Sequence, residues 1–317
     1  MSAAPLFKSG AVALIGRPNA GKSTLLNRIV GQKLAIVSDK PQTTRARVRG
    51  VKNYAADDVS PAGQIVFVDT PGVHKPTHRL NTRMVHAALD AMRDVDVVAL
   101  VVDAAVKPGP GDRFMLDVLK ELKTPVILAL NKVDLIKKTR LLPLLESYRQ
   151  AHPFVEFVPL SAVDGTNVDV LERLFLTYLP EGEPLYPPEY LTDQTERFYA
   201  AEIVREQVLN LTHDELPFST TVVVDQFDET GDDGITKIYC TILVDRESQK
   251  PIVVGRGGAM IKAIGTAARA EMEREMERRV YLDLHVKVKA EWRDNERLLD
   301  DIDKQNRVTR DEPPRPD

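Results

Sequence analysis

The sequence contains a single cysteine, Cys240, in 317 residues. One thiol can neither close an internal disulfide nor build a structural zinc site from several cysteines, so both kinds of cross-link are excluded. This scarcity of cysteine is typical of proteins that work in a reducing compartment. We therefore expect a cytoplasmic location.

Long hydrophobic runs are also missing. The longest apolar stretch, VDVVALVVDA at residues 95–104, is much shorter than the roughly 20 residues that a transmembrane helix needs. The first residues, MSAAPLFKSG, lack the apolar core of a signal peptide. We expect no membrane-spanning segment.

The chain has no large excess of one charge, since its formal net charge is -4. This balance excludes a uniformly basic nucleic-acid coat protein, but it leaves room for a basic patch on one domain.

A chain of 317 residues is long for a single core, so we expect two domains. In the first half, short apolar runs alternate with stretches of helical spacing. The runs are AVALI, QIVFVD, DVVALVVD, PVILALN and FVEFVPL. Such alternation predicts β-α units around a mostly parallel sheet. We assign this α/β domain to residues 8–179.

The proline-rich stretch LPEGEPLYPPEYLTD then interrupts the alternation. Prolines favour an extended, stiff connector over a helix or a central strand, so we assign residues 180–194 to a linker.

Different elements follow the linker. They are an amphipathic helix in ERFYAAEIVREQVLNL, two strands around the turn DETGDDG, a charged helix, and a strand with alternating apolar and polar residues. This order predicts a smaller α+β domain at residues 195–292. The rest, residues 293–317, is charged and has few apolar residues, so we expect a flexible tail.

The segment GRPNAGKST, residues 16–24, follows a predicted strand and precedes a predicted helix. Gly16, Gly21, Lys22 and Ser23 fit the phosphate-loop pattern G-x-x-x-x-G-K-[ST] in the context that it requires. Backbone N–H groups of such a loop surround a β-phosphate, and Lys22 bridges the β- and γ-phosphate oxygens. Ser23 is positioned for Mg²⁺. A plain glycine turn is the weaker interpretation, because the context is right as well as the pattern.

The segment DTPG, residues 69–72, closes the QIVFV strand. A carboxylate at Asp69 can hold a Mg²⁺-bound water, and Gly72 can offer its backbone N–H to a γ-phosphate. Loss of that phosphate would release the segment.

Two further motifs close later strands, where open α/β sheets bind nucleotides: NKVD at residues 131–134 and SAVDG at 161–165. The Asp134 carboxylate only accepts hydrogen bonds. Guanine offers it two donors, whereas adenine offers none in the same positions. Such a pair discriminates by a factor on the order of 10⁴ or more. The backbone of Ala162 could donate to guanine O6. We predict GTP as the nucleotide, and a P-loop small-molecule kinase is disfavoured because NKVD has no role in one.

Taken together, these motifs resemble the Era family of TrmE-Era-EngA-like GTPases, which carry a KH RNA-binding domain after the GTPase domain. The resemblance extends from about Gly10 to Trp292. It rests on GRPNAGKSTLLN, KPQTTR, DTPGVHKP, NKVD, SA, REQVLNLTHDELPFS and VGRGGAMIKAIG. It implies a P-loop GTPase domain followed by a type II KH domain.

The resemblance also assigns roles. Thr44 of QTTR would be the switch-one threonine that reaches Mg²⁺, with Thr43 as the alternative. Val73 stands where Ras-like GTPases carry the glutamine that orients water, so hydrolysis needs another source of charge stabilisation. By hypothesis, Asn19 helps to bind K⁺ beside the phosphates. A simpler interpretation is that Asn19 satisfies the loop backbone.

The expected residues of the nucleotide site form three overlapping sets. The catalytic set is Lys22, Thr44, Gly72 and Asn19, and the metal-binding set is Ser23, Thr44 and Asp69. The nucleotide-binding set is Gly16, Arg17, Pro18, Asn19, Ala20, Gly21, Lys22, Ser23, Thr24, Asp69, Thr70, Pro71, Gly72, Asn131, Lys132, Asp134, Ser161 and Ala162.

In the second domain, GRGG at residues 255–258 fits the G-x-x-G loop of KH domains. Its small residues let an RNA backbone approach, and the following helix supplies N–H groups. The apolar neighbours Ile252, Val253, Val254 and Ile261 would line a groove for unstacked bases, although some of them could instead be core. The expected RNA-binding residues are Ile252, Val254, Gly255, Arg256, Gly257, Gly258, Ile261 and Lys262.

The resemblance implies a monomeric, GTP-hydrolysing switch whose KH domain binds the single-stranded 3′ end of 16S rRNA and which acts in 30S subunit biogenesis. The alternative is a membrane-associated regulatory GTPase, peripheral on the inner face of the cell membrane, whose second domain binds a protein or lipid partner.

Overall fold

The computed structural model describes residues 7–40, 42–72, 78–212, 216–229 and 234–305. The chain forms two compact units. The first comprises residues 1–35, 44–77 and 81–192, and the second comprises residues 36–43, 78–80 and 193–317.

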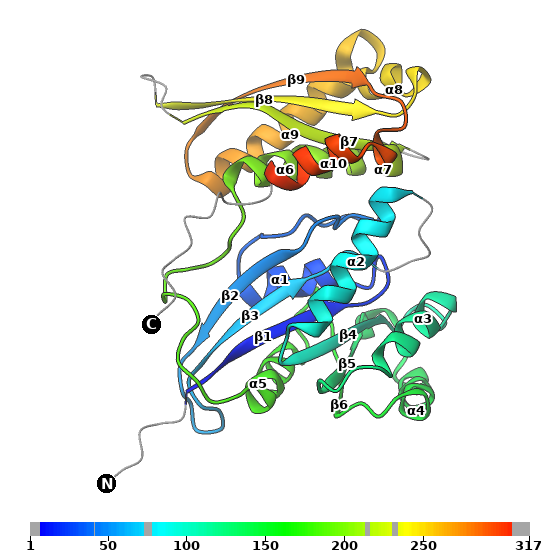
Figure 1. Cartoon of the computed structure of the whole chain (residues 1–317), viewed down its shortest axis with the longest axis vertical. Coiled ribbons are helices and arrows are strands. Elements are labelled where there is room, and N and C mark those ends of the chain that lie inside the picture. The colour runs from blue at the N-terminus through cyan, green and yellow to red at the C-terminus, as the bar shows by residue number, and fades with distance from the viewer. Residues whose placement is uncertain (1–6, 41, 73–77, 213–215, 230–233, 306–317) are drawn as a thin grey trace. The chain divides into compact units, whose positions relative to one another are not determined.

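The first unit is built on a six-stranded sheet of order β2-β3-β1-β4-β5-β6 (Figure 1). Its strands are β1 (Lys8–Ile15), β2 (Val48–Tyr54), β3 (Gly63–Asp69), β4 (Val97–Asp103), β5 (Val126–Asn131) and β6 (Glu156–Pro159). All neighbouring strands pair in parallel except β2, which is antiparallel to β3. The predicted mostly parallel sheet is confirmed, and β2 is an element that the alternation of β and α patterns did not reveal.

Helices cover both faces of this sheet. They are α1 (Lys22–Val30), α2 (Arg79–Arg93), α3 (Pro110–Leu119), α4 (Leu141–Ala151) and α5 (Val168–Tyr178). One face packs against α1 and α5, and the other packs against α2, α3 and α4. Burial on both faces explains why the central strands are continuous apolar runs.

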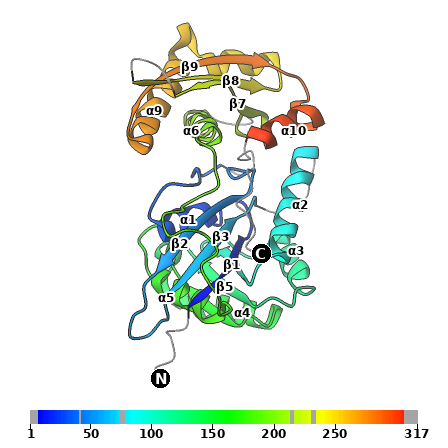
Figure 2. The same cartoon turned by 60° about the vertical axis from the view of Figure 1, so that its left-hand side comes forward.

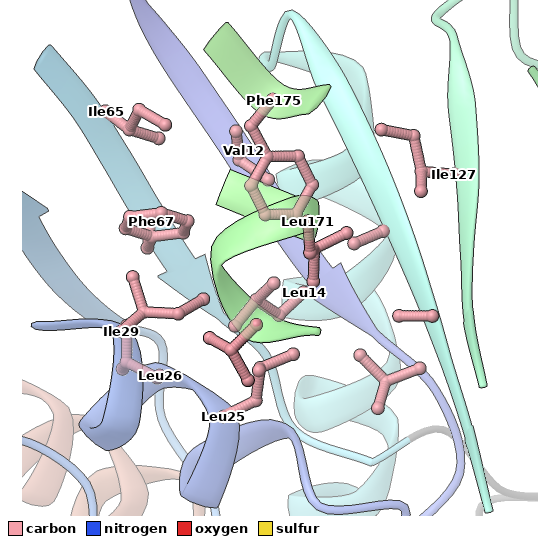
Figure 3. Packing of buried hydrophobic residues seen from close by; sticks show 14 of the residues in the cluster. Val12, Leu14, Leu25, Leu26, Ile29, Ile65, Phe67, Ile127, Leu171 and Phe175 are labelled. Atoms are coloured by element: carbon pink, nitrogen blue, oxygen red, sulfur yellow. The ribbon is translucent and has the colours of Figure 1, made fainter. Parts of the chain in front are cut away.

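Figure 3 shows the first of these two cores, where side chains of α1 and α5 meet those of β1 and β3. Phe67 of β3 and Phe175 of α5 pack edge to face, with ring centroids 5.8 Å apart. Both rings are fully buried. This packing holds α1, and the loop that precedes it, against the end of β1.

The predicted linker lies along the first unit as far as Thr192. The carboxamide of Gln64 on β3 donates to the Tyr186 carbonyl at 2.8 Å and accepts from the Tyr186 N–H at 2.9 Å. The ring of Tyr186 stacks on that of Tyr190 at 4.5 Å. These contacts give the proline-rich segment a defined course.

The second unit contains a three-stranded sheet of order β7-β8-β9 (Figure 2). Strand β7 (Thr220–Asp228) is antiparallel to β8 (Ile235–Val244), and β9 (Arg279–Val288) is parallel to β8. The helices are α6 (Glu196–Leu211), α7 (Leu216–Ser219), α8 (Lys250–Val254), α9 (Ala259–Met276) and α10 (Glu296–Gln305). One core joins the sheet to α6, α8 and α9. The predicted smaller α+β domain is confirmed.

The expectation of a flexible tail is wrong for residues 293–305. Trp292 is buried, and its indole N–H donates to the Ser219 carbonyl at 2.8 Å. Helix α10 follows and buries Leu299. The tail has few apolar residues, but its Leu299 and the adjacent Trp292 anchor it. Residues 306–317 lie outside the described part of the chain.

Within the described ranges, we find no helix that combines the length and the apolar character needed to cross a bilayer.

Candidate functional site

The predicted nucleotide motifs meet at one edge of the first unit. Strands β1, β3, β4, β5 and β6 run in the same direction, so their carboxyl ends lie together. The phosphate loop follows β1, DTPG ends β3, NKVD ends β5 and SAVDG follows β6. This is the edge at which open α/β sheets bind ligands.

The phosphate loop needs glycine at its two fixed positions. Gly16 has φ of 150° and Gly21 has φ of 94°. A Cβ on Gly16 would lie 2.2 Å from the Val101 carbonyl oxygen, and one on Gly21 would lie 2.2 Å from Nδ2 of Asn131. Any larger residue would therefore push the loop out of position.

Lys22 is the first residue of α1 and is only 5% exposed. Its Nζ donates to the carbonyls of Gly16, at 3.3 Å, and Arg17, at 3.1 Å. Burial lowers the pKa of this ammonium, and the Asp69 carboxylate opposes that shift. The lysine is thus held inside the loop, where a phosphate oxygen can replace a carbonyl as its partner.

The side chain of Arg17 makes an ion pair within the first unit. Its Nη1 pairs with Oδ2 of Asp112 at 2.7 Å, and the same oxygen accepts from the Gly109 N–H at the start of α3. The side chain thereby ties the loop to α3. Sequence reasoning missed Asp112, although an acidic residue three positions after Gly109 is a helix-start signal.

The three predicted metal ligands lie together. Oγ of Ser23 is 2.7 Å from Oγ1 of Thr44 and donates to Oδ2 of Asp69 at 2.7 Å. Thr44 also reaches that carboxylate oxygen, at 3.4 Å. These are hard oxygen donors of the kind that Mg²⁺ prefers.

Asp69 carries a second indication of a metal site. It is fully buried, and its Oδ1 has no hydrogen-bond partner among the described residues. Burial raises the pKa of this carboxyl, while Lys22 and the hydrogen bonds from Ser23 and Thr44 oppose the shift. An unpaired buried carboxylate oxygen is costly, and a Mg²⁺-bound water would satisfy it. The residues present therefore fit Mg²⁺.

The structure separates the two candidate threonines. Thr43 donates its hydroxyl to the Lys40 carbonyl at 2.6 Å, and its own carbonyl accepts a hydrogen bond from the buried Arg205 of α6. Its polar groups are therefore used within the second unit, to which residues 36–43 belong. Thr44 is the threonine beside Ser23 and Asp69.

Asn131 joins three loops of the nucleotide edge. Its Nδ2 donates to the Ala20 carbonyl at 2.9 Å, and its Oδ1 accepts from the N–H groups of Lys132, at 2.8 Å, and Ala162, at 2.9 Å. The Ala162 N–H, expected to donate to guanine O6, is thus engaged by Asn131 here. The Asp134 side chain is exposed and lies three residues after Asn131.

The remaining nucleotide-site residues take distinct places. The hydroxyl of Thr70 donates to the Leu14 carbonyl at 2.9 Å, which gives this side chain a structural contact. A Cβ on Gly72 would lie 2.6 Å from the Pro18 backbone nitrogen, so these two loops pass each other closely. Asn19 has a left-handed φ of 64°. Val73 lies outside the described residues.

In the second unit, the G-x-x-G loop lies between α8 and α9. Gly255, Gly257 and Gly258 have φ of 75°, 59° and 81°, which favours glycine at all three positions. Arg256 and Lys262 are exposed, and Ile252 is 52% exposed. Val253, which was expected to line the groove with its neighbours, is instead fully buried and belongs to the core. The glycine loop, two exposed cations and an exposed apolar side chain therefore lie within one short segment that a ligand can reach.

Comparisons with known proteins agree with the division of the chain into two units. The family model described as 50S ribosome-binding GTPase matches residues 11–132, and the model described as KH domain matches residues 215–293. The chain is 49% identical over 296 residues to GTPase Era of Geobacter metallireducens, with 93% of this chain and 97% of that protein covered. It is 47% identical over 294 residues to GTPase Era of Syntrophus aciditrophicus, with 93% and 94% covered.

Two crystal structures are similar over nearly the whole chain. One is a point variant of Aquifex aeolicus Era bound to GDP.AlF4-, with a TM-score of 0.87, 41% identity, and 92% of this chain and 98% of that chain covered. The other is Era in complex with MgGDPNP and nucleotides 1506-1542 of 16S ribosomal RNA, with a TM-score of 0.88, 42% identity, and 93% and 98% covered.

The separation of the two threonines leads to a first prediction. Replacing Thr44 by valine removes the hydroxyl beside Ser23 and Asp69 at nearly constant volume. We expect the preference for GDPNP over GDP in Mg²⁺ to fall about tenfold, which corresponds to ~1.4 kcal/mol. Thr43→Val is the matched control and should change this preference less than twofold. Calorimetric titration of both variants with both nucleotides measures it, and a larger effect from Thr43→Val would reverse the assignment.

Proposed function

The chain belongs to the Era family of GTPases, and from this premise we propose that it is a GTP-hydrolysing switch that binds the single-stranded 3′ end of 16S rRNA through its KH domain and acts in 30S subunit biogenesis. The observation that carries the proposal is the junction at Asn131, which joins the phosphate loop to the base-reading motif in one unit. The G-x-x-G loop of the other unit supplies the RNA site. We keep residues 8–179 and 195–292 as the proposed limits of the two domains.

At the nucleotide edge, each residue has a physical role. Lys22 and the N–H groups at the start of α1 bind the β- and γ-phosphates. Ser23, Thr44 and Asp69 would hold Mg²⁺, which offsets negative charge on the phosphate oxygens when it is bound. Asp134 selects guanine by accepting hydrogen bonds from two donors that adenine lacks. Gly72 offers its backbone N–H to the γ-phosphate, so this contact is lost after hydrolysis.

At the RNA site, the glycines let a phosphate backbone come close to the N-terminal end of α9. Arg256 and Lys262 supply positive charge, which positions the strand without reading its sequence. Exposed Ile252 and half-buried Val254 and Ile261 offer apolar contact to unstacked bases. Single-stranded RNA is the ligand class that such a loop and groove bind.

The RNA proposal predicts the effect of a charge in the G-x-x-G loop. Gly257→Asp should weaken binding of a short single-stranded RNA from the 3′ end of 16S rRNA by about 100-fold, because the carboxylate would face the phosphates. A Cβ at Gly257 meets nothing within 4 Å, so the residue has room. Gly234→Asp is the matched control, since Gly234 also has a positive φ, of 68°, and open space. Fluorescence anisotropy with GDPNP-loaded protein measures both.

If the two variants weaken RNA binding equally, the effect comes from charge or from strain, and the loop is not the site. If wild-type protein does not bind the RNA, the proposed function fails.

We propose further that K⁺ supports hydrolysis beside the phosphate loop. Asn19 is exposed and has a left-handed backbone within the phosphate loop, and its carboxamide is the group that would contact the ion. Potassium there would supply positive charge to the γ-phosphate oxygens, in the way that an arginine finger does.

This idea predicts a cation-dependent rate. Turnover of GTP by the wild-type protein should be at least about tenfold faster in KCl than in NaCl at equal ionic strength, as expected for one added transition-state charge. Asn19→Gly keeps the left-handed backbone and removes the carboxamide, so it should abolish the difference. Equal rates in the two salts would remove potassium from the mechanism.

Finally, we propose that the protein is cytoplasmic and contacts the membrane peripherally. The segment of the first unit from Leu135 to Leu142 supports this proposal. Leu135 is 65% exposed and Leu142 is 75% exposed. Between them lie three exposed cations, Lys137, Lys138 and Arg140. Exposed leucines beside a basic cluster suit the interface of an anionic bilayer, where the apolar groups enter and the cations meet headgroups.

This surface predicts lipid-dependent sedimentation. The GDP-bound protein should sediment with phosphatidylglycerol vesicles and remain in solution with phosphatidylcholine vesicles. Replacing Leu135 and Leu142 by serine together should lower the sedimented fraction several-fold, because each leucine contributes about 1.5–3 kcal/mol when fully buried. Replacing the exposed Val59, which lies in the β2–β3 connection, by serine is the control. If the wild-type protein sediments with neither lipid, the membrane contact is rejected and only the ribosomal role remains.

A further inference from the structure

Lys132 is held in an unusual conformation between Asn131 and Asp134. Its φ of 66° lies in the left-handed region, which costs free energy for a residue other than glycine. The Asn131 carboxamide holds its N–H at 2.8 Å. Its ammonium pairs with Oδ2 of Asp103 at 2.6 Å. The lysine is therefore fixed at both its backbone and its tip.

Asp103 is itself rigidly placed. It is the last residue of β4 and pairs with Asn131 of β5 in the register of the sheet. Its second oxygen, Oδ1, accepts from the Ala105 N–H at 2.8 Å, and the Ala104 N–H donates to the Asn131 carbonyl at 2.9 Å. With both oxygens engaged, the carboxylate has little freedom to rotate. It is a fixed anchor beside the base-reading motif.

The ion pair is partly shielded from water. The side chains of Lys132 and Asp103 are 27% and 17% exposed. A charge-assisted hydrogen bond in such a setting is stronger than an exposed surface pair. It can therefore hold a long side chain that would otherwise sample many rotamers.

Two consequences follow for the guanine site. The four-carbon stem of Lys132 must extend from the end of β5 to the end of β4, along the edge where the nucleotide motifs meet. Its charge is also held by Asp103, and so it does not neutralise the Asp134 carboxylate two residues away. A free, flexible lysine at this position could do so, because opposite charges attract at short range.

We propose that Asp103 is a positioning residue for guanine recognition: by holding Lys132, it keeps the lysine stem as a wall of the base site and leaves Asp134 available to the base. The inference rests on the proposed function, since it deepens the account of the same nucleotide site. A simpler interpretation is that Asp103 only closes the turn after β4 through its bond to Ala105.

One substitution separates the two interpretations. Asp103→Asn keeps an oxygen that can accept from the Ala105 N–H, and so it preserves the turn, but it removes the charge that holds Lys132. If Asp103 acts through Lys132, the KM for GTP should rise about tenfold while kcat at saturating GTP is unchanged, because the residue acts on the base and not on the transferred phosphate. The dissociation constant for GDP should rise by the same factor. A residue that only closed the turn would leave all three values unchanged.

A double-mutant cycle tests the route of the effect. Lys132→Met keeps the length of the stem and removes its charge, so it should weaken GDP binding about as much as Asp103→Asn. The double variant should be no weaker than either single variant, since both remove the same interaction. Additive losses would show that Asp103 does not act through Lys132 and would overturn the proposal.

Glu172→Gln is the matched control, because it breaks another shielded ion pair of the same unit. Lys52 pairs with Glu172 at 2.5 Å, and these side chains are 31% and 14% exposed. This pair joins β2 to α5 and lies outside the nucleotide motifs, so the control should leave KM unchanged. An equal rise in KM for Glu172→Gln would mean that general loosening of the unit explains the effect, which would also overturn the proposal.

The outcomes distinguish this inference from the function on which it rests. If the wild-type protein binds GDP and GTP, and Asp103→Asn does not change their affinity, Asp103 has no role in positioning and the GTPase assignment stands. If the wild-type protein does not bind guanine nucleotides, the proposed function fails together with the inference. A fall in kcat at unchanged KM would place the effect at the phosphates and would reject a role at the base.

Discussion

The nucleotide edge depends on one buried carboxamide. Asn131 is 2% exposed and holds the Ala20 carbonyl of the phosphate loop, the backbone of Lys132, and the N–H of Ala162. Its Nδ2 also occupies the space that a side chain at Gly21 would need. Three loops from three strands thus share one side chain, because a primary amide carries N–H donors and an oxygen acceptor on the same carbon. Phosphate binding and base recognition are thereby parts of one rigid arrangement.

In each unit, the helices that pack on the sheet decide where groups that can bind a ligand lie. In the first unit, helices bury both faces, so only the loops at the strand ends remain for chemistry. In the second unit, α6, α8 and α9 share the core with the sheet, and the glycines between α8 and α9 form the accessible loop. Buried apolar residues supply rigidity in both cases. Polar groups that face a ligand lie at the ends of the elements that this packing fixes.

Much of the fold and of the site could be predicted because the signals are local. Helix α6 begins and ends where its sequence pattern indicated, and the four nucleotide motifs lie at strand ends as expected. The antiparallel β2 was missed because its pairing partner is known only from the sheet. The ordered α10 was missed because a charged segment with few apolar residues is typical of disorder. Only the fold shows that Trp292 and Leu299 are buried and anchor it.

The sequence by itself determined which loops could surround phosphates and which carboxylate could select guanine. Glycine spacing, strand ends and the hydrogen-bonding capacity of a side chain are properties of a short segment. Only the tertiary structure decided that Thr44 and not Thr43 lies beside Ser23, that Arg17 turns to Asp112, and that Lys132 pairs with Asp103. Each of these contacts joins residues that are distant in the chain, and their proximity follows from how the sheet and helices pack rather than from any local pattern.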